Sequence, residues 1–599
     1  MYDASARPNE KSPSLNECLE TGPPLQNKIW SVLVRNRFHP VALAGDLKQA
    51  FLQVRIKELE RDVMRFHWLK DFTTRKVETL RFTRALFGLS TSPFLLGGVI
   101  EQHLQDMESV YPEEVAEIRR SLYVDDLITG GKTITETQHL KESCQTIFSE
   151  AKFELHKWHS NIATLEAETT LTETESVPSY AKEQLGVKTG ETKLLGITWN
   201  KETDTIEVNF PKPLTEITKR EVLGKIARVY DPLGLASPTT LVGKMVYRDA
   251  CDTRIPWDKE LPRELMTAWR SWEKSLPERV QVPRSLIKHQ EEIEAIDLHA
   301  FGDASSKGVS TVVYAVKQQT SGGNQGLVLA KSRLAKKGLT IPRLELVAGH
   351  MSTNLVHNVK ESLQGFPIRN VYSNLDSTVA LHWIRGRGEY KQFVNHRVRK
   401  IQDKPYVQWR YVSSKENPAD LGIRGGRVDE SSKLWLNGPS WLAKEEEWPA
   451  DIVTISSKES QEEAKVVKDV LAVAVKTQDE LDDLIQKWEF WKVIRISAWI
   501  ARFRQNCRTK ERIVGPLTTE ELNAQIEFWV KRESNLDATG SRSLEKRNCS
   551  STFKWTNEGY LNAEGVYKET SQSICLMETY SLRSLWHTRM WRLFMWELA

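Results

Sequence analysis

The chain of 599 residues has few cysteines and no long apolar run. Its 6 cysteines include no Cys-x-x-Cys pair, which argues against a disulfide framework and against a cysteine zinc site. No uninterrupted apolar stretch could span a bilayer, and the N-terminal residues lack the basic and apolar regions of a signal peptide. We therefore expect an intracellular, cytoplasmic protein with no membrane partner.

The charge of the chain is unevenly distributed. Its net charge is only +4, but residues 301–425 contain 19 Lys and Arg against 8 Asp and Glu. A basic segment of domain size is typical of a protein that binds a polyanion such as nucleic acid. A solvated Lys/Arg surface is the alternative interpretation. Glycine and proline counts are ordinary, which excludes collagen-like and wholly disordered proteins.

The first group of candidate catalytic residues consists of three aspartates within the first 165 residues. Asp46 follows the apolar run 41–44, which predicts a buried strand. Asp125 and Asp126 occupy the tip of a predicted hairpin at 122–129. If these carboxylates converge, they can hold two Mg²⁺ (or Mn²⁺) ions for phosphoryl transfer. Ordinary turn chemistry is the alternative for the Asp-Asp pair.

A second group of acids lies in the basic segment. Asp303 and Asp376 each follow an apolar strand, Glu345 stands in a predicted helix start, and Asp420 comes 44 residues after Asp376. Four of the eight acids in this segment are thus candidate ligands, as expected if acids persist there only where metals neutralise them. The alternative is that Asp303 and Asp376 cap helices and Glu345 is an exposed helix residue.

The first group resembles a reverse transcriptase palm. The segment 123–126 matches the YxDD hairpin of that family, and Asp46 matches its other catalytic aspartate. The resemblance implies RNA-directed DNA synthesis from dNTPs on an RNA template, with Phe51 as an aromatic gate against the ribose 2′-hydroxyl. A core aromatic remains the alternative for Phe51. The resemblance also implies a primer-grip region at 194–199 and a substrate-binding set of Phe51, Phe87, Gly88, Ser92, Pro93 and Tyr123.

The second group has the acid order of the ribonuclease H family, and this resemblance implies hydrolysis of RNA in an RNA–DNA hybrid. The two resemblances imply two metal ions in each active site. The implied catalytic residues are Asp46, Asp125 and Asp126 in the first site and Asp303, Glu345, Asp376 and Asp420 in the second, and all of them except Asp420 are implied metal ligands. Basic residues predicted to meet phosphates are Arg385, Arg387, Lys391, Arg397, Arg399 and Lys400. For the interleaved aromatics Trp383, Tyr390 and Phe393, core packing is favoured over base stacking.

Further stretches resemble the Bel/Pao class of LTR retrotransposon polyproteins, over roughly residues 1–532. They are the segments 2–7, 230–238, 257–258 and 417–421. The resemblance implies a chain truncated at both ends, with incomplete fingers and impaired polymerisation, working in the cytoplasm or in virus-like particles beside other polyprotein products. We find no Asp-Thr-Gly or Asp-Ser-Gly protease motif, despite the peptidase label attached to the Pao family name, and no integrase zinc-finger spacing.

These motifs predict an α/β and α+β multidomain protein. The expected order is a palm with partial fingers (1–165), an acidic linker (166–192), a thumb/connection region (193–295), an RNase H-like α/β domain (296–426), a charged linker (427–480), a helical integrase-proximal stub (481–535) and an unassigned tail (536–599). Four functions remain open: polymerase with RNase H, RNase H alone, a nucleic-acid-binding remnant without catalysis, and a host-adopted interaction protein.

Overall fold

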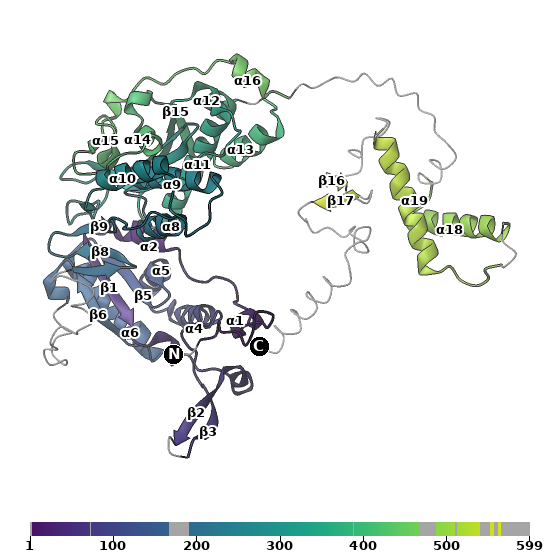
Figure 1. The fold of residues 1–599 in the computed structure, drawn as a ribbon, viewed down its shortest axis with the longest axis horizontal. Helices are drawn as coiled ribbons and strands as arrows, with labels where there is room; N and C mark the ends of the chain where they lie inside the picture. Colours follow the sequence, from purple (N-terminus) through teal and green to yellow (C-terminus); the bar gives the residue numbers. More distant parts are fainter. Residues whose placement is uncertain are drawn as a thin grey trace. The chain divides into compact units, whose positions relative to one another are not determined.

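The computed structural model describes residues 3–71, 74–166, 191–386, 388–465, 487–508, 512–538, 552–555 and 561–564. The chain is a mixed α/β multidomain protein, as expected, and it divides into two compact units, Met1–Lys465 and Val466–Ala599 (Figure 1). Among the helices described, none combines the length and the apolar character that crossing a membrane requires.

The first sheet of unit 1 holds the first group of aspartates. Its strand order is β4-β5-β1-β6, and all neighbours are antiparallel. The strands are β1 (Val41–Leu47), β4 (Leu122–Tyr123), β5 (Asp126–Gly131) and β6 (Leu155–Ser160). Leu43 and Leu47 join one apolar core and Ala42 and Ala44 join another. Both faces of β1 are therefore buried, which explains its continuous apolar run.

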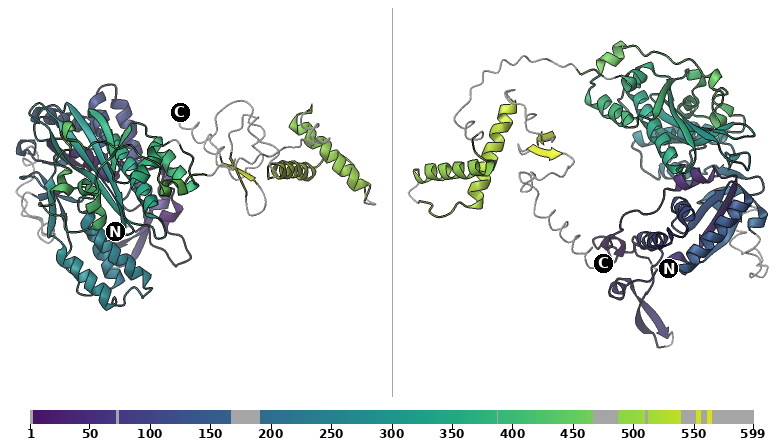
Figure 2. Two further views of the ribbon diagram at one scale, coloured as in Figure 1. Left: turned by 90° about the horizontal axis from the view of Figure 1, so that it is seen from above. Right: turned by 180° about the vertical axis from the view of Figure 1, so that it is seen from behind.

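Helices cover this sheet. They are α2 (Ile29–Asn36), α4 (Ser92–Met107), α5 (Pro112–Ser121) and α6 (Ile134–Glu150). Shorter elements are α1 (Leu15–Cys18), α3 (Ala50–Gln53), η1 (Glu58–Met64) and η2 (Ala163–Leu165). A separate hairpin of β2 (Arg65–Asp71) and β3 (Lys76–Arg81) projects away from the sheet (Figures 1 and 2).

A second antiparallel sheet follows, with order β10-β9-β8-β7. Its strands are β7 (Glu191–Leu194), β8 (Ile197–Asn200), β9 (Thr205–Asn209) and β10 (Arg279–Pro283). The sequence predicts one strand over 193–199, and this prediction is wrong, because the chain reverses at Leu195 and Gly196. Both have positive φ, 44° and 91°, which gives a tight hairpin turn instead of an extended strand.

Three helices lie between β9 and β10 in the sequence. They are α8 (Lys219–Arg228), α9 (Ser237–Asp252) and α10 (Arg263–Ser275). Trp269 and Trp272 of α10 pack with Val246 of α9 and Val222 of α8 in a core of their own. The residues 218–221 have the pattern of a capping box, which predicts a helix start, and the cap forms: the Thr218 hydroxyl accepts a hydrogen bond from the Glu221 N–H.

The third sheet has five strands in the order β13-β12-β11-β14-β15. They are β11 (Ala295–Ala304), β12 (Gly308–Gln318), β13 (Asn324–Leu334), β14 (Ile368–Leu375) and β15 (Val407–Tyr411). β11, β14 and β15 are parallel to one another, and the other neighbours are antiparallel. The helices of this region are α11 (Ile341–Ser362), α12 (Thr378–Arg385), α13 (Gln392–Gln402) and α14 (Pro418–Arg424).

The segment after α14 packs onto the same region. The short helix η4 (Ser414–Glu416) comes just before α14. The helices α15 (Lys433–Asn437), η5 (Glu445–Glu447) and α16 (Lys458–Glu462) follow α14. Trp435 and Trp441 are buried in the core that includes Tyr314 and Phe301 of the five-stranded sheet. Residues expected to open a charged linker therefore contribute to the core, because their tryptophans bury large apolar surfaces.

Unit 2 contains two packed helices, α18 (Phe490–Asn506) and α19 (Thr519–Ala538). Val493 and Ile494 of α18 contact Trp529 of α19. A short antiparallel pair, β16 (Thr552–Trp555) and β17 (Leu561–Glu564), is also described. Most of the expected acidic linker, residues 167–190, and most of the expected C-terminal tail lie outside the described residues.

Candidate active sites

Two neighbouring antiparallel strands bring the first three aspartates to one edge of the first sheet. Asp46, near the end of β1, stands directly opposite Asp126, the first residue of β5. The backbone N–H of Leu47 donates to the carbonyl oxygen of Asp125 at 2.8 Å. Aspartates 79 positions apart in the sequence thus become neighbours because β1 pairs with β5 in this register.

The three carboxylates interact electrostatically. Burial raises the pKa of Asp126 to about 6, with further contributions from the charges of Asp125 and Asp46 and an opposing one from Lys157. Burial and then the charge of Asp46 raise the pKa of Asp125, against a hydrogen bond from its own backbone. Carboxylates that disfavour one another's ionisation in this way favour a nearby cation.

The hairpin between β4 and β5 is strained at its tip. Val124 has a φ of 58°, a left-handed conformation that β-branched residues rarely adopt. The two-residue loop of Val124 and Asp125 is closed by the pairing of Tyr123 with Asp126. Backbone strain of this kind costs about 1–3 kcal/mol and clusters at functional sites. The strained turn fixes where Asp125 leaves the sheet.

Two residues that the sequence analysis did not single out contact Asp46. Its carboxylate lies 2.8 Å from Nε2 of His156 and 3.4 Å from Nζ of Lys157, both on β6. Lys157 itself has a φ of 51°. No local sequence signal marks these two residues, because their approach depends on the pairing of β6 with β1 across the sheet.

The predicted substrate-binding residues other than Tyr123 lie between the end of β1 and the first turn of α4. Phe51 of α3 is 7% exposed and makes an edge-to-face contact with Phe87, at 4.7 Å between ring centroids, whereas Phe87 is 58% exposed. Gly88 has a φ of 89° and its carbonyl accepts from Asn16. Ser92 and Pro93 begin α4, and the Ser92 hydroxyl donates to the Leu86 carbonyl at 2.7 Å.

Tyr123 lies near a second tyrosine from the following region. The charge of Tyr123, after burial, contributes to the raised pKa of Tyr230. The Tyr230 hydroxyl donates to the Leu195 carbonyl at the tip of the β7–β8 hairpin, 2.6 Å away. A side chain at Gly196 would approach the Tyr230 ring to 2.9 Å. Tyr230 thus fixes the tip of the hairpin that the resemblance equates with the primer grip.

The second group of acids converges on the carboxyl ends of two adjacent parallel strands. Asp303 is the penultimate residue of β11, and Asp376 follows β14 directly. Glu345, on α11, lies at the same place: its Oε2 accepts a hydrogen bond of 2.5 Å from the hydroxyl of Ser377, the residue after Asp376. Asp420 lies on α14 and pairs with Arg424 at 2.8 Å.

The electrostatics of this cluster tie all four acids together. Burial raises the pKa of Asp303 to about 8, and the charges of Asp376, Asp420 and Glu345 add to the increase. The pKa of Asp376 is raised chiefly by burial, against hydrogen bonds from Ser414 and Asn417. The pKa of Glu345 is likewise raised by burial and by Asp376, against the bond from Ser377. A group of buried acids this close together is a candidate site for multivalent cations.

Neutral side chains hold the acids in place. Ser377 caps α12 by accepting from the Ala380 N–H, and its hydroxyl donates to Glu345. Asn417 donates to the Gly302 carbonyl beside Asp303. Both residues lie beside predicted acids in the sequence, Ser377 next to Asp376 and Asn417 within the segment 417–421, but only the fold shows what they contact.

The predicted phosphate contacts fall into different environments. Arg385 is held by the Asp451 carboxylate and by the carbonyls of Trp409 and Ile452, and Arg397 stacks on Phe393 at 3.6 Å. Lys391, Arg399 and Lys400 are exposed at or on α13. Arg387 lies outside the described residues. Trp383 and Tyr390 are buried in a core, which confirms the packing interpretation for these two aromatics.

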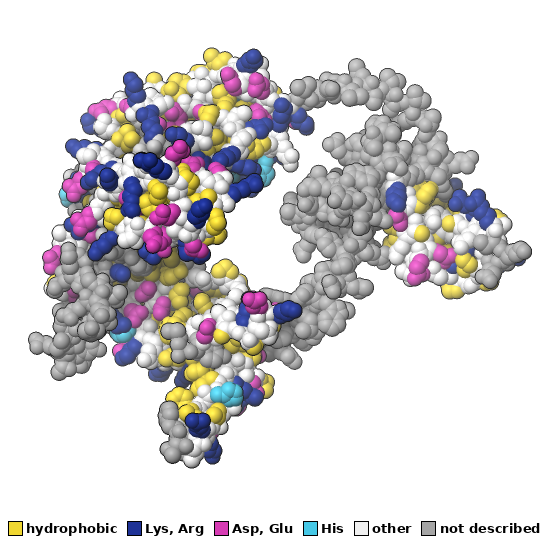
Figure 3. All heavy atoms as spheres, viewed as in Figure 1, with side chains coloured by type: hydrophobic (Ala, Val, Ile, Leu, Met, Phe, Trp, Pro, Cys, Tyr) yellow, Lys and Arg dark blue, Asp and Glu magenta, His cyan; other side chains and the backbone are white. Residues whose placement is uncertain are grey.

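The exposed side chains of α13 extend a cationic surface that includes α11. Burial lowers the pKa of His350, on α11, to about 4, and the charges of Arg397, Lys400, Lys404 and His396 lower it further. Lys and Arg side chains are frequent over the part of unit 1 that contains α8–α11 and α13 (Figure 3). The charge of this face is suited to a phosphate backbone.

Metal binding can be judged from the donor chemistry. Across the ranges that the structure describes, no set of three or more His, Cys, Asp or Glu side chains has the spacing of a formed metal site. Both carboxylate clusters nevertheless offer the oxygen ligands that Mg²⁺ prefers. A divalent cation would offset the burial and the mutual repulsion that together raise the pKa values of Asp126 and Asp303. The residues present therefore fit such ions.

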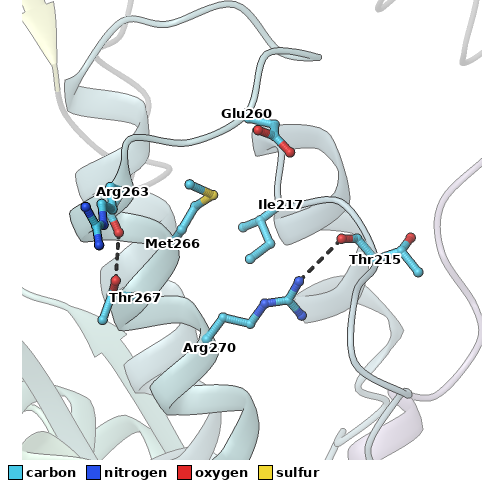
Figure 4. A pocket seen from close by; sticks show the side chains of 7 residues that line it. All are labelled: Thr215, Ile217, Glu260, Arg263, Met266, Thr267 and Arg270. Carbon is cyan, nitrogen blue, oxygen red and sulfur yellow. Dashed lines mark hydrogen bonds between the residues drawn. The ribbon is translucent and has the colours of Figure 1, made fainter.

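A pocket on α10 lies apart from these clusters. Thr215, Ile217, Glu260, Arg263, Met266, Thr267 and Arg270 line its volume of about 350 Å³ (Figure 4). Arg270 is already engaged by the carbonyls of Leu214 and Thr215 and by Glu273. Glu260 is the only acid in its lining, so it does not offer the carboxylate chemistry of the two clusters.

Two family models match the chain. Residues 15–199 match reverse transcriptase (RNA-dependent DNA polymerase), and residues 218–377 match the Pao retrotransposon-like RNaseH-like domain. The first match contains Asp46, Asp125 and Asp126, and the second contains Asp303, Glu345 and Asp376. A search of curated proteins found no match.

Solved structures of foamy viral protease–reverse transcriptase are similar to this chain. One, in complex with an RNA/DNA hybrid, is 13% identical with a TM-score of 0.39 and covers 68% of this chain and 49% of its own. Another, described as dRH in complex with ds DNA, is 13% identical with a TM-score of 0.40. The match covers 68% of this chain and 64% of that structure's chain. The chain thus spans about half the length of the first.

Proposed function

We propose that this chain, which carries a reverse transcriptase domain and a Pao retrotransposon-like RNaseH-like domain, synthesises DNA on an RNA template and hydrolyses RNA in RNA–DNA hybrids. The observation that supports the proposal is the presence of two separate groups of acids, each drawn from distant parts of the sequence, in which burial and then the neighbouring carboxylates raise the pKa of Asp126 and of Asp303. Ordinary capping or turn aspartates do not gather in this way.

In the polymerase site we propose Asp46, Asp125 and Asp126 as ligands of two Mg²⁺ (or Mn²⁺) ions. When bound, such ions activate the attacking oxygen and stabilise the leaving one. The strained tip at Val124 positions Asp125, and the pairing of β1 with β5 positions Asp46 against Asp126. These contacts set the geometry of the carboxylates before any substrate arrives.

For the incoming dNTP, we propose that Phe51 excludes a ribose 2′-hydroxyl. Its edge-to-face contact with Phe87 fixes the ring, and Phe87 keeps an exposed face toward solvent. The segment containing Gly88, Ser92 and Pro93 is tied to Asn16 and to the start of α4, which gives the proposed template side a rigid support.

In the nuclease site we propose Asp303, Glu345 and Asp376 as metal ligands and Asp420 as a further catalytic acid. Ser377 orients Glu345, and Ser414 and Asn417 orient Asp376. Lys391, Arg399 and Lys400 are exposed at or on α13 and form no ion pair among the residues that the structure describes, so they are the better candidates for phosphate contacts of a bound hybrid. Arg385 is less suited, because Asp451 already neutralises it.

The test uses the full chain with one variant in each site. Asp125→Asn should abolish primer extension and spare hybrid hydrolysis, and Asp303→Asn should do the reverse. We expect each loss to exceed about 100-fold, because even outer-shell partners of metal ligands cost about 10–100-fold. Asp106→Asn, an exposed position on α4, is the matched control and should leave both activities unchanged.

The outcomes separate the proposal from its rivals. Hybrid hydrolysis that depends on Asp303, without any primer extension, would assign the nuclease activity alone. Binding of a hybrid with neither activity in Mg²⁺ or Mn²⁺ would assign a nucleic-acid-binding protein without catalysis. Loss of both activities in the Asp106→Asn control would mean that the assay reports folding and not chemistry.

A further inference from the structure

A cavity of about 380 Å³ lies at the place where five elements of unit 1 meet, and neither carboxylate cluster lines it. Its walls come from α2, the end of α8 with the turn after it, α9, the edge strand β13 and α11. Cavities of this size fall in the range of about 300–1,000 Å³ that is typical of small-ligand pockets. The turn is part of the segment 230–238, which the sequence analysis singled out without finding a role for it.

One side of this cavity is cationic. Lys244 of α9 and Lys331 and Arg333 of β13 line it, and none of the three has an ion pair or side-chain hydrogen bond within the described part of the chain. Burial lowers the pKa of Lys331, and the charges of Arg333 and Lys244 lower it further. Three cations that repel one another without a paired acid form a favourable site for an anion.

Hydroxyl groups extend the cationic wall. Ser237 and Thr240 of the first turn of α9 line the cavity beside these cations. Ser332 of β13 also borders it, but its hydroxyl is hydrogen-bonded to that of Ser310. The acid in the lining, Asp231, is buried and occupied, because its two oxygens accept from the N–H groups of Leu235 and Ala236 at 2.8 Å. Asp231 thus stabilises the turn. Its charge attracts Lys244, but it forms no ion pair with Lys244, Lys331 or Arg333 in the described part of the chain.

The rest of the lining is largely apolar and contains an indole. Trp30 of α2, Ile226 and Val229 at the end of α8, Pro232 and Leu355 line it. Trp30 is half-buried, and Nζ of Lys28 lies 5.8 Å from its ring. A ligand with an anionic end and a flat, apolar end would satisfy both walls, and a nucleotide has this shape and polarity.

The turn is fixed against β13 by a glycine. Gly234 has a φ of 68°, and a Cβ there would lie 1.9 Å from the carbonyl oxygen of Ala330. The N–H of Ala330 donates to the carbonyl of Leu233 at 2.9 Å. The backbone of the turn therefore lies directly on the edge strand, which brings Ser237 and the start of α9 beside Lys331 and Arg333.

We propose that this cavity binds one unpaired nucleotide of a single-stranded nucleic acid, with the phosphate on Lys244, Lys331 and Arg333 and the base against Trp30. The inference deepens the proposed function, since a chain that works on templates and hybrids meets unpaired strands. It assigns the segment 230–238 a role in shaping a nucleotide pocket between the reverse transcriptase and RNaseH-like domains. Binding needs no metal and no catalysis.

The test measures the anisotropy of a short fluorescein-labelled oligouridylate bound to the full chain in EDTA. The double variant Lys331→Glu with Arg333→Glu should bind at least about tenfold more weakly. The slope of log K against log salt concentration should become shallower by about 1.4, because each of the two lost phosphate contacts on a single strand contributes about 0.7. The matched control is Lys212→Glu with Lys433→Glu, which reverses two exposed lysines outside the cavity. Equal effects of the two pairs would overturn the proposal.

The apolar wall has its own test. Trp30→Ala should weaken oligouridylate binding by about 5- to 150-fold, the equivalent of one stacked base, without changing the salt dependence. Trp30→Tyr keeps an aromatic face and should restore most of the affinity, which guards against a folding defect. If inorganic phosphate displaces the oligouridylate as well as uridine 5′-monophosphate does, the base contact is refuted.

Failure of this inference and failure of the proposed function are distinguishable. In an Asp125→Asn or Asp303→Asn background, Trp30→Ala should still weaken oligouridylate binding, because neither carboxylate cluster lines the cavity. Pocket-dependent binding in a chain without polymerase or nuclease activity would uphold the pocket and overturn the activities. Unaltered binding by the pocket variants in an active chain would do the opposite.

Discussion

At the residue scale, position 234 shows how a single glycine fixes the path of the chain. The methyl group of an alanine there would collide with the Ala330 carbonyl, and the alanine backbone would have to adopt a φ of 68°. We expect Gly234→Ala to lower the free energy of unfolding by at least about 2 kcal/mol, from steric overlap and backbone strain. Urea unfolding of the full chain measures the change.

Gly224 provides the matched control for this prediction. It lies inside α8, and a Cβ there would meet nothing within 4 Å. Gly224→Ala should therefore raise the free energy of unfolding by about 0.5–1 kcal/mol, as expected for glycine in a helix interior. Equal effects of the two substitutions would show that the contact between the turn and β13 is not formed in solution.

Also at the residue scale, His299 makes the protein sensitive to acid. It is buried between Tyr372 and Trp448, its Nε2 has no hydrogen-bond partner among the described residues, and burial lowers its pKa to about 3. The unfolded chain takes up a proton below about pH 6.5, whereas the folded chain does not. This residue therefore costs stability progressively as the pH falls from about 6.5 toward 3.

Replacing the imidazole by a ring that cannot ionise should remove this cost. His299→Phe keeps the aromatic contacts and should stabilise the protein at pH 4.5, relative to its effect at pH 7.5, by about 2–3 kcal/mol, since one unit of pKa shift corresponds to about 1.4 kcal/mol. Thermal unfolding at the two pH values measures the difference. His139→Phe, at an exposed position on α6, should show almost no pH-dependent gain.

At the element scale, helix α8 depends on its N-terminal cap. The Thr218 hydroxyl accepts from the Glu221 N–H, and Thr218 is itself buried. Thr218→Ala should lower the free energy of unfolding by about 1 kcal/mol, because it leaves a helix N–H unsatisfied. Thr267→Ala, in the interior of α10 where the hydroxyl donates to the Arg263 carbonyl, should change it by less than about 0.5 kcal/mol. Denaturant midpoints compare the two.

At the scale of the whole molecule, the excess of positive charge in residues 301–425 should appear as salt-dependent binding. Arg399→Glu with Lys400→Glu removes two exposed cations from α13. We expect the salt dependence of hybrid binding to become shallower by about 1.8, because each phosphate contact on a duplex contributes about 0.9. Anisotropy titrations over a range of salt concentrations measure this slope. A slope that is unchanged in the double variant would show that the hybrid does not contact Arg399 and Lys400.

Buried cations also join regions that are distant in the sequence. Arg284, after β10, pairs with Asp204 and donates to the carbonyls of Asn36 and His39. Arg37 donates to the carbonyls of Leu327 and Val328 on β13. These contacts hold α2, the second sheet and the third sheet in one unit, which matches the single compact unit Met1–Lys465.

Local patterns in the sequence determined the strands at Asp46 and Asp303, the hairpin tip at 125–126 and the cap of α8, because each depends on residues within about four positions of one another. They failed at 193–199, where the turn at Leu195 and Gly196 interrupts a run of strand-forming residues. Only the tertiary structure decided that His156 and Lys157 meet Asp46, that Ser377 and Asn417 support the second acid cluster, and that Trp30 shares a cavity with Lys331. These contacts join strands and helices far apart in the chain, and the register and packing that create them are set by burial of side chains on both faces of each sheet.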